Sequence, residues 1–179
     1  LMLTKAGFIK RTSLSAFSKI RSNGLIAINL EDGDALTWVR LSKEGDSVLI
    51  GSRTGMAIHF RLDINELRPL GRTARGVKSM NLRDGDNLVS MDVLTSDLVD
   101  ELARIEDNGE EINENLEENS SDGPWVLIAS SFGLGKRVPV TQFRLQKRAG
   151  MGLRAIKFRL ENDVLVCLKV LGEGEELLF

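Results

Sequence analysis

Three stretches of the sequence can be laid over one another, and this internal repeat limits the possible folds more than any other feature of the chain. Gly7 aligns with Gly55 at a spacing of 48 residues, and Gly33 aligns with Gly85 at a spacing of 52. The repeating unit is therefore about 45–50 residues long. The three copies cover residues 1–46, 47–94 and 125–171; residues 95–124 separate the second copy from the third, and residues 172–179 begin a further copy.

Each copy predicts four short antiparallel strands, so the chain as a whole predicts an all-β fold. A glycine-containing turn joins the first two strands, and a crossing segment that ends in Gly24, Gly76 or Gly152 leads to the third. The first, second and fourth strands are expected at 1–4, 8–11 and 35–41, at 48–52, 56–61 and 87–94, and at 126–130, 134–138 and 164–171. Period-two apolar pairs place the third strands at Ile28/Leu30, Met80/Leu82 and Ile156/Phe158.

A single four-stranded sheet of this size cannot bury both of its faces, so the copies must pack against one another as blades. This arrangement predicts a β-pinwheel or propeller-like fold in which blades are arrayed around an axis. Three blades are too few to close a ring, because propellers have roughly 4 to 8 blades. We therefore expect the chain to be a fragment that carries about three four-stranded blades of a larger disc.

The segment 95–124 differs sharply in charge from its surroundings. It holds 11 acidic residues and one basic residue, whereas residues 125–171 hold nine basic and two acidic residues. Few large apolar residues and a self-repelling run of charge predict a mobile surface insertion. Its first part, 96–105, is compatible with a short helix capped by Ser96. Two interpretations remain open: a solvated loop, or an anionic mimic that competes for a basic surface of the same molecule.

The residue inventory argues against catalysis by this chain. It has one histidine (His59), one cysteine (Cys167) and no tyrosine, so no zinc cluster can be assembled, no tyrosyl nucleophile exists, and neither a Cys/His nor a Ser/His/Asp catalytic geometry is expected. No apolar run approaches the roughly 18 residues of a membrane helix, so a membrane partner is not expected. Binding is therefore the expected activity, with no cofactor in this fragment.

Basic residues recur at equivalent positions of the copies. Along one rim of a disc, cations spaced blade by blade can neutralise the phosphates of a curved duplex without reading its sequence. The alternative is a protein-interaction scaffold whose rim charges only keep it soluble. The candidate DNA-binding residues are Lys10 and Arg11 with their equivalents Lys136 and Arg137, Arg72 with Arg148, Lys78 with Arg154, and the neighbouring Arg21, Arg75 and Lys147.

Several phrases of the sequence resemble one known family. The runs KAGFIKRTSLSAF, SNGLIAINLEDGDAL, RPLGRTARGVKSMNLRDGDNLVSM and GLGKRVPV are similar to successive repeats of the C-terminal domain of the DNA gyrase A subunit. GRTARGVK is typical of that family and of its relative, the topoisomerase IV A subunit, which is the alternative. The resemblance implies a β-pinwheel whose basic outer edge binds and wraps double-stranded DNA.

The same resemblance implies a place in a larger enzyme. In a gyrase, this domain supports ATP-dependent negative supercoiling by a type II topoisomerase, in which its partners are the B subunit plus a second copy of the A subunit. ATP and Mg²⁺ are bound elsewhere in that enzyme, and its catalytic tyrosine lies in a different domain of the A subunit. The fragment itself is expected to carry no catalytic residues.

The same resemblance suggests an interpretation of one further motif. The run from Gln146 to Gly152 is similar to the gyrase box Gln-Arg-Arg-Gly-Gly-Lys-Gly but departs from it at Ala149 and Met151, so a box-like wrapping role and an ordinary inter-blade loop both remain open.

The third copy resembles plant organellar gyrase A subunits, and the long acidic insertion fits an elaborated form. This favours a chloroplast or mitochondrion, with bacterial cytoplasm as the alternative.

Overall fold

The computed structural model describes residues 1–19, 22–107 and 124–171. The strands are β1 (Met2–Thr4), β2 (Phe8–Lys10), β3 (Leu36–Val39), β4 (Ser47–Ser52), β5 (Met56–Arg61), β6 (Val77–Lys78), β7 (Leu88–Leu94), β8 (Trp125–Ser130), β9 (Gly135–Pro139), β10 (Leu153–Arg154) and β11 (Leu165–Leu171). The helices are α1 (Ser96–Asp107) and the short 3₁₀ helices η1 (Leu14–Phe17) and η2 (Val140–Gln142).

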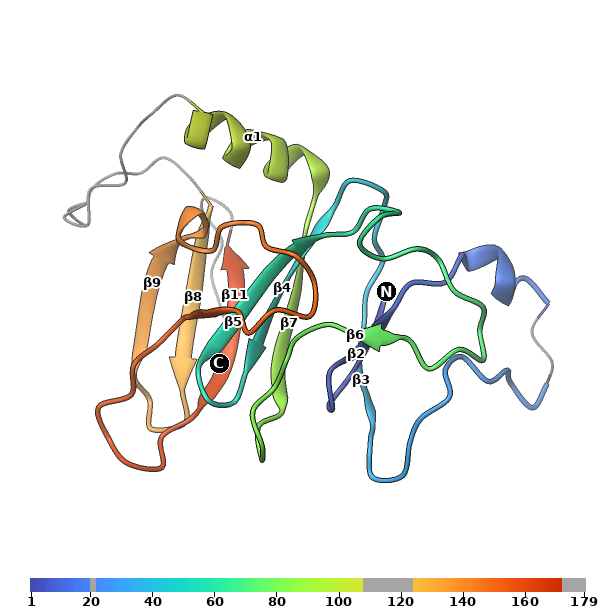
Figure 1. The fold of residues 1–179 in the computed structure, drawn as a ribbon, viewed down its shortest axis with the longest axis horizontal. Helices are drawn as coiled ribbons and strands as arrows, with labels where there is room; N and C mark the ends of the chain where they lie inside the picture. Colours follow the sequence, from blue (N-terminus) through green and yellow to red (C-terminus); the bar gives the residue numbers. More distant parts are fainter. Residues whose placement is uncertain (20–21, 108–123, 172–179) are drawn as a thin grey trace.

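The strands form three antiparallel sheets that stand side by side like blades (Figure 1). Sheet A has the order β3-β1-β2-β6, sheet B the order β10-β5-β4-β7, and sheet C the order β11-β8-β9. In each sheet the first two strands of one copy form a hairpin, and the last strand of that copy lies beside the first. The all-β, blade-like prediction is therefore confirmed.

In sheets A and B, one strand does not come from the copy that supplies the other three. β6 belongs to the second copy yet pairs with β2 of the first, and β10 belongs to the third copy yet pairs with β5 of the second. The prediction that each copy builds its own four-stranded blade is therefore wrong. The exchanged strands also lie earlier than expected, because Met80 and Ile156 are buried in the cores between sheets instead of joining a ladder. Ile28 and Leu30 lie in no strand.

Glycine makes the strand exchange possible. Gly76 and Gly152 immediately precede β6 and β10, with φ angles of +104° and +75°. A Cβ on Gly76 would lie 2.6 Å from the carbonyl oxygen of Ile9, and one on Gly152 would collide with the carbonyl oxygen of Ala57. Only a residue without a side chain lets the crossing segment approach the preceding blade this closely.

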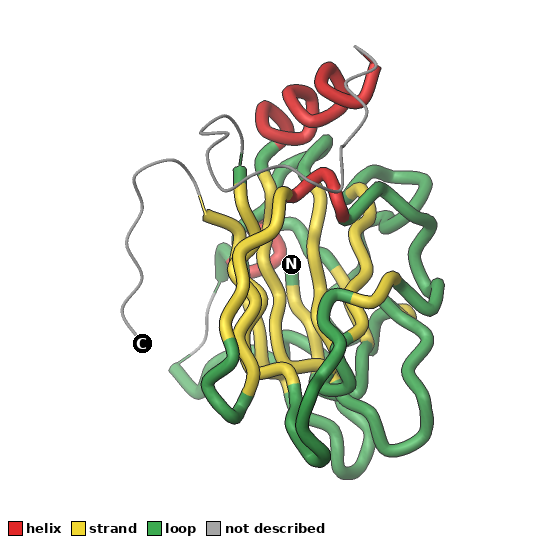
Figure 2. Tube along the Cα trace, turned by 90° about the vertical axis from the view of Figure 1, so that its left-hand side faces the viewer, coloured by secondary structure: helices red, strands yellow, loops and turns green. Residues whose placement is uncertain are grey.

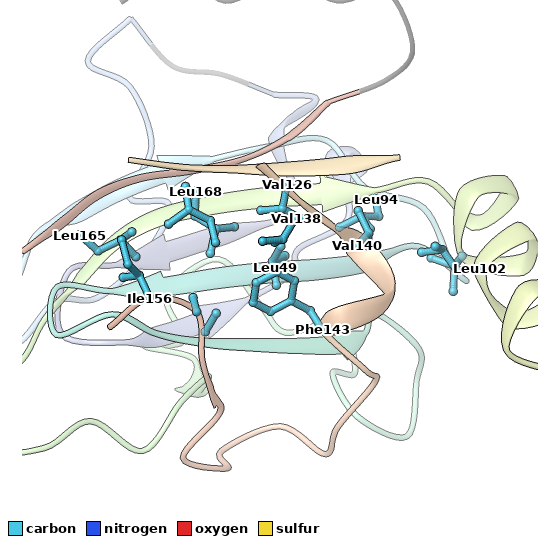
Figure 3. Packing of buried hydrophobic residues seen from close by; sticks show 14 residues of the cluster. Leu49, Leu94, Leu102, Val126, Val138, Val140, Phe143, Ile156, Leu165 and Leu168 are labelled. Atoms are coloured by element: carbon cyan, nitrogen blue, oxygen red, sulfur yellow. The ribbon is translucent and has the colours of Figure 1, made fainter. Parts of the chain in front are cut away.

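Two apolar clusters fill the spaces between the sheets. Sheets A and B enclose Leu3, Ile9, Ile50 and Phe60, all of them fully buried. The second cluster lies between sheets B and C, and in Figure 3 Leu49, Val138, Phe143 and Leu168 point into one shared space. Because burial of one such side chain stabilises a fold by about 1.5–3 kcal/mol, packing between blades accounts for much of the stability.

The beginning of the acidic insertion is a packed helix and not a mobile loop. α1 lies across one end of the strands, as Figure 2 shows, and its residues Val99 and Leu102 are buried against Val140 and Phe143 of the third copy. The helix was predicted at 96–105, but Ser96 is not its cap. The Ser96 N–H donates to the Asp46 carboxylate at 2.9 Å. The mobile character predicted for the remainder concerns 108–123, which lie outside the described residues.

His59 is a buried packing residue on β5 and not a ligand. Its Nδ1–H donates to the Phe143 carbonyl oxygen at 2.7 Å, which leaves Nε2 to accept from the Ser47 hydroxyl at 2.7 Å. Burial lowers the pKa of His59 below its usual 6.5, the bond to Phe143 opposes this shift, and the Arg61 charge adds to it. The neutral imidazole therefore ties the second copy to the third.

We predict that Gly152→Ala destabilises the chain more than Gly85→Ala. Both glycines have a φ of +75°, so both substitutions carry the backbone strain of about 1–3 kcal/mol. Only Gly152 is pressed against another strand, since a Cβ on Gly85 meets nothing within 4 Å. The new methyl group of Gly152→Ala would displace β5 or β10, which should add about 1–3 kcal/mol to the loss of stability. Urea unfolding measures both losses, and equal losses would show that the close approach is not required.

We also predict that the chain loses stability as the pH falls through the range below 6.5. Because the folded-state pKa of His59 is lowered, the unfolded chain binds the extra proton first, and stability decreases from about pH 6.5 down to the folded pKa. His59 is the only histidine, so an NMR titration of its ring reports this pKa directly. A folded pKa at or above 6.5 would contradict the prediction; His59→Gln should remove the histidine part of the loss.

Candidate nucleic-acid interface

Neighbouring blades contact each other at one edge of their sheets, here called the joined edge. At the joined edge, β7 and β11 contact each other: the Ser90 hydroxyl donates to the Leu168 carbonyl at 2.7 Å, and the Asp92 carboxylate pairs with Lys169 at 2.8 Å. We call the side formed by β3, β7 and β11 the inner edge. The exchanged strands β6 and β10 lie at the opposite side of their sheets, which we call the outer edge.

The outer edge carries exposed basic side chains at equivalent positions of successive blades. Lys78 on β6 and Arg154 on β10 occupy the same position of the repeat, and both are exposed. The exposed residues Arg75 and Lys147 lie in the crossing segments just before these strands. In sheet C no strand covers β9 within the described residues, and Lys136 and Arg137 are exposed there.

Two of these cations rest on aromatic rings. The Arg75 guanidinium lies 4.1 Å from the centre of the Phe8 ring and also pairs with Glu31. The Arg137 guanidinium lies 4.3 Å from the Trp125 ring. A ring beneath a guanidinium restrains its plane while its outer N–H groups stay available to an anion. The role of Phe8 and Trp125 was not predicted, because cross-strand neighbours become visible only once the register is known.

Lys10 is not available to a phosphate, contrary to the prediction. Its side chain is fully buried, and its ammonium group donates to the carbonyl oxygens of Gly71, Arg72 and Ala74, with the Gly71 and Ala74 contacts at 3.0 and 3.1 Å. Burial lowers its pKa, and the Arg72 charge lowers it further. The three accepting carbonyls belong to the crossing segment that leads to β6. Lys10 therefore fixes this segment onto the first blade.

Arg11 is also internal and not a DNA contact. Its Nη1 donates to the Leu62 carbonyl at 2.8 Å and pairs with the Glu44 carboxylate at 2.7 Å, and its side chain is 9% exposed. These contacts join the end of the first hairpin to the loops that flank sheet B. The equivalent residue Arg137 is exposed, because no following sheet supplies equivalents of Leu62 and Glu44 to it within the described part of the chain.

Arg72 and Arg148 are half-buried and hold backbone. The Arg72 guanidinium donates to the Ile26 carbonyl at 3.3 Å. Arg148 donates from Nε to the Glu66 carbonyl at 2.8 Å and from Nη1 to the Lys78 carbonyl at 2.6 Å. Both side chains therefore position the crossing segments, and any phosphate contact from them stays a prediction. Arg21 lies outside the described residues.

The segment from Gln146 to Gly152 is a connection between blades. The Gln146 N–H donates to the His59 carbonyl and the Ala149 N–H to the Ser79 carbonyl, both in the second copy. Ala149 adopts a φ of +63°, a value that its counterpart in the gyrase box, a glycine, would reach without strain. The loop is thus held on the neighbouring blade with Lys147 exposed; a box-like role in wrapping stays a prediction.

Two structural features are absent from the described residues. They contain no group of three or more His, Cys, Asp or Glu side chains placed to hold a metal ion. Among their helices, none has the length and apolar character needed to cross a membrane. The exposed cations of the outer edge are the feature from which we infer function.

Comparisons with known proteins point to one family. The family model described as "DNA gyrase C-terminal domain, beta-propeller" matches residues 1–43, 46–95 and 124–170. The DNA gyrase A subunit of Synechocystis is 55% identical over 184 residues, which cover 99% of this chain and 21% of that relative. The chloroplastic/mitochondrial DNA gyrase A subunit of Arabidopsis thaliana is 38% identical over 172 residues, which cover 96% of this chain and 17% of that relative.

A solved structure supports the same fold. The C-terminal domain of DNA topoisomerase IV superposes on 96% of this chain with a TM-score of 0.74 at 24% sequence identity, and the match covers 46% of that domain's chain. The propeller-like prediction is thereby confirmed. The chain spans about a fifth of the length of the curated relatives that it matches.

We predict that Lys10→Met destabilises the chain by about 2–3 kcal/mol, because three partly buried carbonyl groups lose a charged donor. Lys147→Met is the matched control. It also removes a lysine ammonium group, but an exposed one on the crossing segment that leads to β10, and it should change stability by less than about 0.5 kcal/mol. Urea unfolding of both variants tests this. Equal effects would mean that the carbonyl contacts of Lys10 contribute nothing.

Proposed function

The chain belongs to the DNA gyrase C-terminal domain family, and we propose that it binds and wraps double-stranded DNA along its outer edge without reading the base sequence. The observation that carries this proposal is the recurrence of exposed cations on successive exchanged strands, Lys78 on β6 and Arg154 on β10. Arg75, Lys147, Lys136 and Arg137 extend the same positive edge.

The shape of the edge supports contact with phosphates and not with bases. β6 and β10 each contain two residues, and neither offers a helix or a long ribbon that could enter a DNA groove. Side chains at the tips of such strands reach the sugar-phosphate backbone, where they release counterions and bind all sequences alike. Arginine and lysine both suit this role, and the stacked guanidiniums of Arg75 and Arg137 are preoriented for it.

Wrapping follows if the duplex contacts several blades in turn. Each blade of a propeller is rotated about the axis relative to its neighbour, so a duplex that follows the outer edge must bend. Smooth bending of a 20–30 bp site costs about 1–6 kcal/mol, which additional phosphate contacts on each further blade can offset. Affinity should therefore increase with duplex length until the edge is filled.

We further propose that the chain serves as the wrapping part of a gyrase A subunit. In that enzyme, an ATP-dependent type II topoisomerase, it would act with a second A subunit, together with the B subunit, which supplies the ATP and Mg²⁺ chemistry. The relatives named as DNA gyrase A subunits support this proposal over a topoisomerase IV role, because the topoisomerase IV structure is 24% identical and supports the fold alone.

We also propose a cellular compartment for the chain. The cyanobacterial relative is 55% identical and the plant organellar relative 38%, so the identities favour the bacterial cytoplasm over the chloroplast or mitochondrion.

A pair of charge-removing variants tests the function. We predict that Lys78→Ala combined with Arg154→Ala weakens binding to duplexes of different sequence by the same factor. It should also lower the slope of log K against log salt by about 2, since each phosphate contact contributes about 0.9. The measurement is a gel shift with linear duplexes of several lengths at two or more salt concentrations.

The matched control is Lys5→Ala combined with Arg53→Ala. These residues are also repeat-equivalent and exposed, but they lie at the inner edge, where their carbonyls accept from Leu88 and Leu165. The control should leave the salt slope unchanged. Absence of DNA binding by the unaltered chain at low salt would overturn the proposal in favour of a protein-interaction scaffold. If the Lys78→Ala/Arg154→Ala variant lost a preference among DNA sequences, these residues would read bases and not phosphates.

A further inference from the structure

One cation of the outer edge is already paired with an anion of the same chain. The Arg75 guanidinium, which lies over the Phe8 ring, pairs through Nη1 with the Glu31 carboxylate. Both charged side chains are exposed, at 43% and 59%, so the pair lies on the surface that we assign to DNA. A carboxylate therefore occupies the edge of the guanidinium where a phosphate would bind.

The ion pair lies in a junction of regular geometry. The Arg72 side chain, on the crossing segment of the second copy, donates to the Ile26 carbonyl of the first copy at 3.3 Å. In the next junction the equivalent Arg148 donates to the Lys78 carbonyl at 2.6 Å. Each crossing segment is thus held in the same way against the segment that contains the third strand of the copy before it. Contact between these two segments is a repeated feature of the fold.

The other two copies carry the opposite charge at the position of Glu31. Seven residues after the glycine that ends each crossing segment stand Glu31, Arg83 and Arg159. Both arginines are exposed, and neither forms an ion pair with another of the described residues. Met151 takes the place of Arg75 in the second junction, so that junction has no cation for an acidic residue to occupy. The ion pair is therefore particular to the first junction.

We propose that Glu31 is an intramolecular competitor of DNA phosphate for Arg75, which makes the first junction the weakest part of the DNA-binding edge. This inference rests on the proposed function and concerns the regulation of the same edge. Arg83 and Arg159, which the sequence analysis did not select, add unpaired cations to the later blades. The duplex is held first by those blades, and Arg75 joins the contact only after DNA displaces Glu31.

The strength of the ion pair suits a competitor that DNA can displace. A pair between exposed side chains shifts an equilibrium by about 1.5- to 5-fold. Arg75 and Lys78 are three residues apart, which is at most about 10 Å between their Cα atoms. A duplex that is bound to Lys78 therefore presents its phosphates to Arg75 at high effective concentration. Glu31 lowers the affinity of the empty edge but does not prevent complete wrapping.

The variant Glu31→Gln tests the proposal, because it keeps the size of the side chain and removes its charge. In gel shifts of the full 179-residue chain with linear duplexes, Glu31→Gln should bind DNA about 2- to 5-fold more tightly. The slope of log K against log salt should become steeper by up to about 0.9, because Arg75 gains a phosphate contact.

Asp32→Asn is the matched control. Asp32 is the exposed neighbour of Glu31 in the same turn, and it forms no ion pair with another of the described residues. The substitution removes the same charge without releasing Arg75, so it should leave the salt slope unchanged. Equal affinity and equal slope of Glu31→Gln and the unaltered chain would overturn the proposal, as would an equal increase of the slope in Asp32→Asn.

The variant Arg75→Ala identifies the group through which Glu31 acts. In the Glu31→Gln background it should cancel the steeper slope, whereas in the unaltered chain it should change the slope little because Glu31 already occupies Arg75. A steeper slope that persists in the double variant would overturn the proposal. Absence of DNA binding by the unaltered chain at low salt would instead overturn the proposed function and this inference with it.

The contrast between the blades has a separate test. Arg83→Ala combined with Arg159→Ala should lower the salt slope by about 2, because each lost phosphate contact contributes about 0.9. Arg75→Ala in the unaltered chain serves as the comparison, since it removes an arginine that Glu31 occupies. An unchanged slope in the Arg83→Ala/Arg159→Ala variant would remove the difference between early and later blades and overturn the proposal.

Discussion

The exchange of a two-residue strand between neighbouring blades is the interaction on which the rest of the structure depends. β6 and β10 each leave their own copy and complete the sheet before it, at a distance that only Gly76 and Gly152 permit. The exchange fixes the order of the blades, since each sheet needs residues from the next copy. It also decides where Lys78 and Arg154 lie, because the second residue of each exchanged strand is exposed, whereas the first, Val77 or Leu153, is half-buried.

The same exchange explains why one repeat position has opposite roles in different blades. Lys10 and Lys136 are equivalent in the sequence, yet Lys10 is buried beneath the crossing segment that feeds β6 and Lys136 is exposed on an uncovered β9. A buried ammonium is stable only with its donors satisfied, and three carbonyls of that segment satisfy them. The charge of a residue thus says little about DNA contact until the neighbouring blade is known.

The repeat spacing was sufficient to predict the hairpins, the fourth strands and the propeller-like class, because glycine turns and period-two patterns are local signals. The third strands were misplaced, because Met80 and Ile156 have a strand-like spacing but serve the packing between sheets. The burial of Lys10 and Arg11 also escaped prediction, since the backbone carbonyls to which they donate are 51 to 64 residues away in the sequence. The segment that forms α1 was expected to be solvated, and Val99 and Leu102 are buried through contacts with a different copy.

A surface built this way must obtain its DNA affinity from the number of blades and not from any single site. Each exchanged strand is two residues long and offers one cation at its exposed position, so one blade neutralises about one phosphate through that strand. A single such contact is weak and strongly screened at physiological salt, where the Debye length is about 8 Å. Affinity and bending therefore arise together: only a duplex that curves around successive blades engages enough cations to remain bound, which makes wrapping a consequence of how little each blade contributes alone.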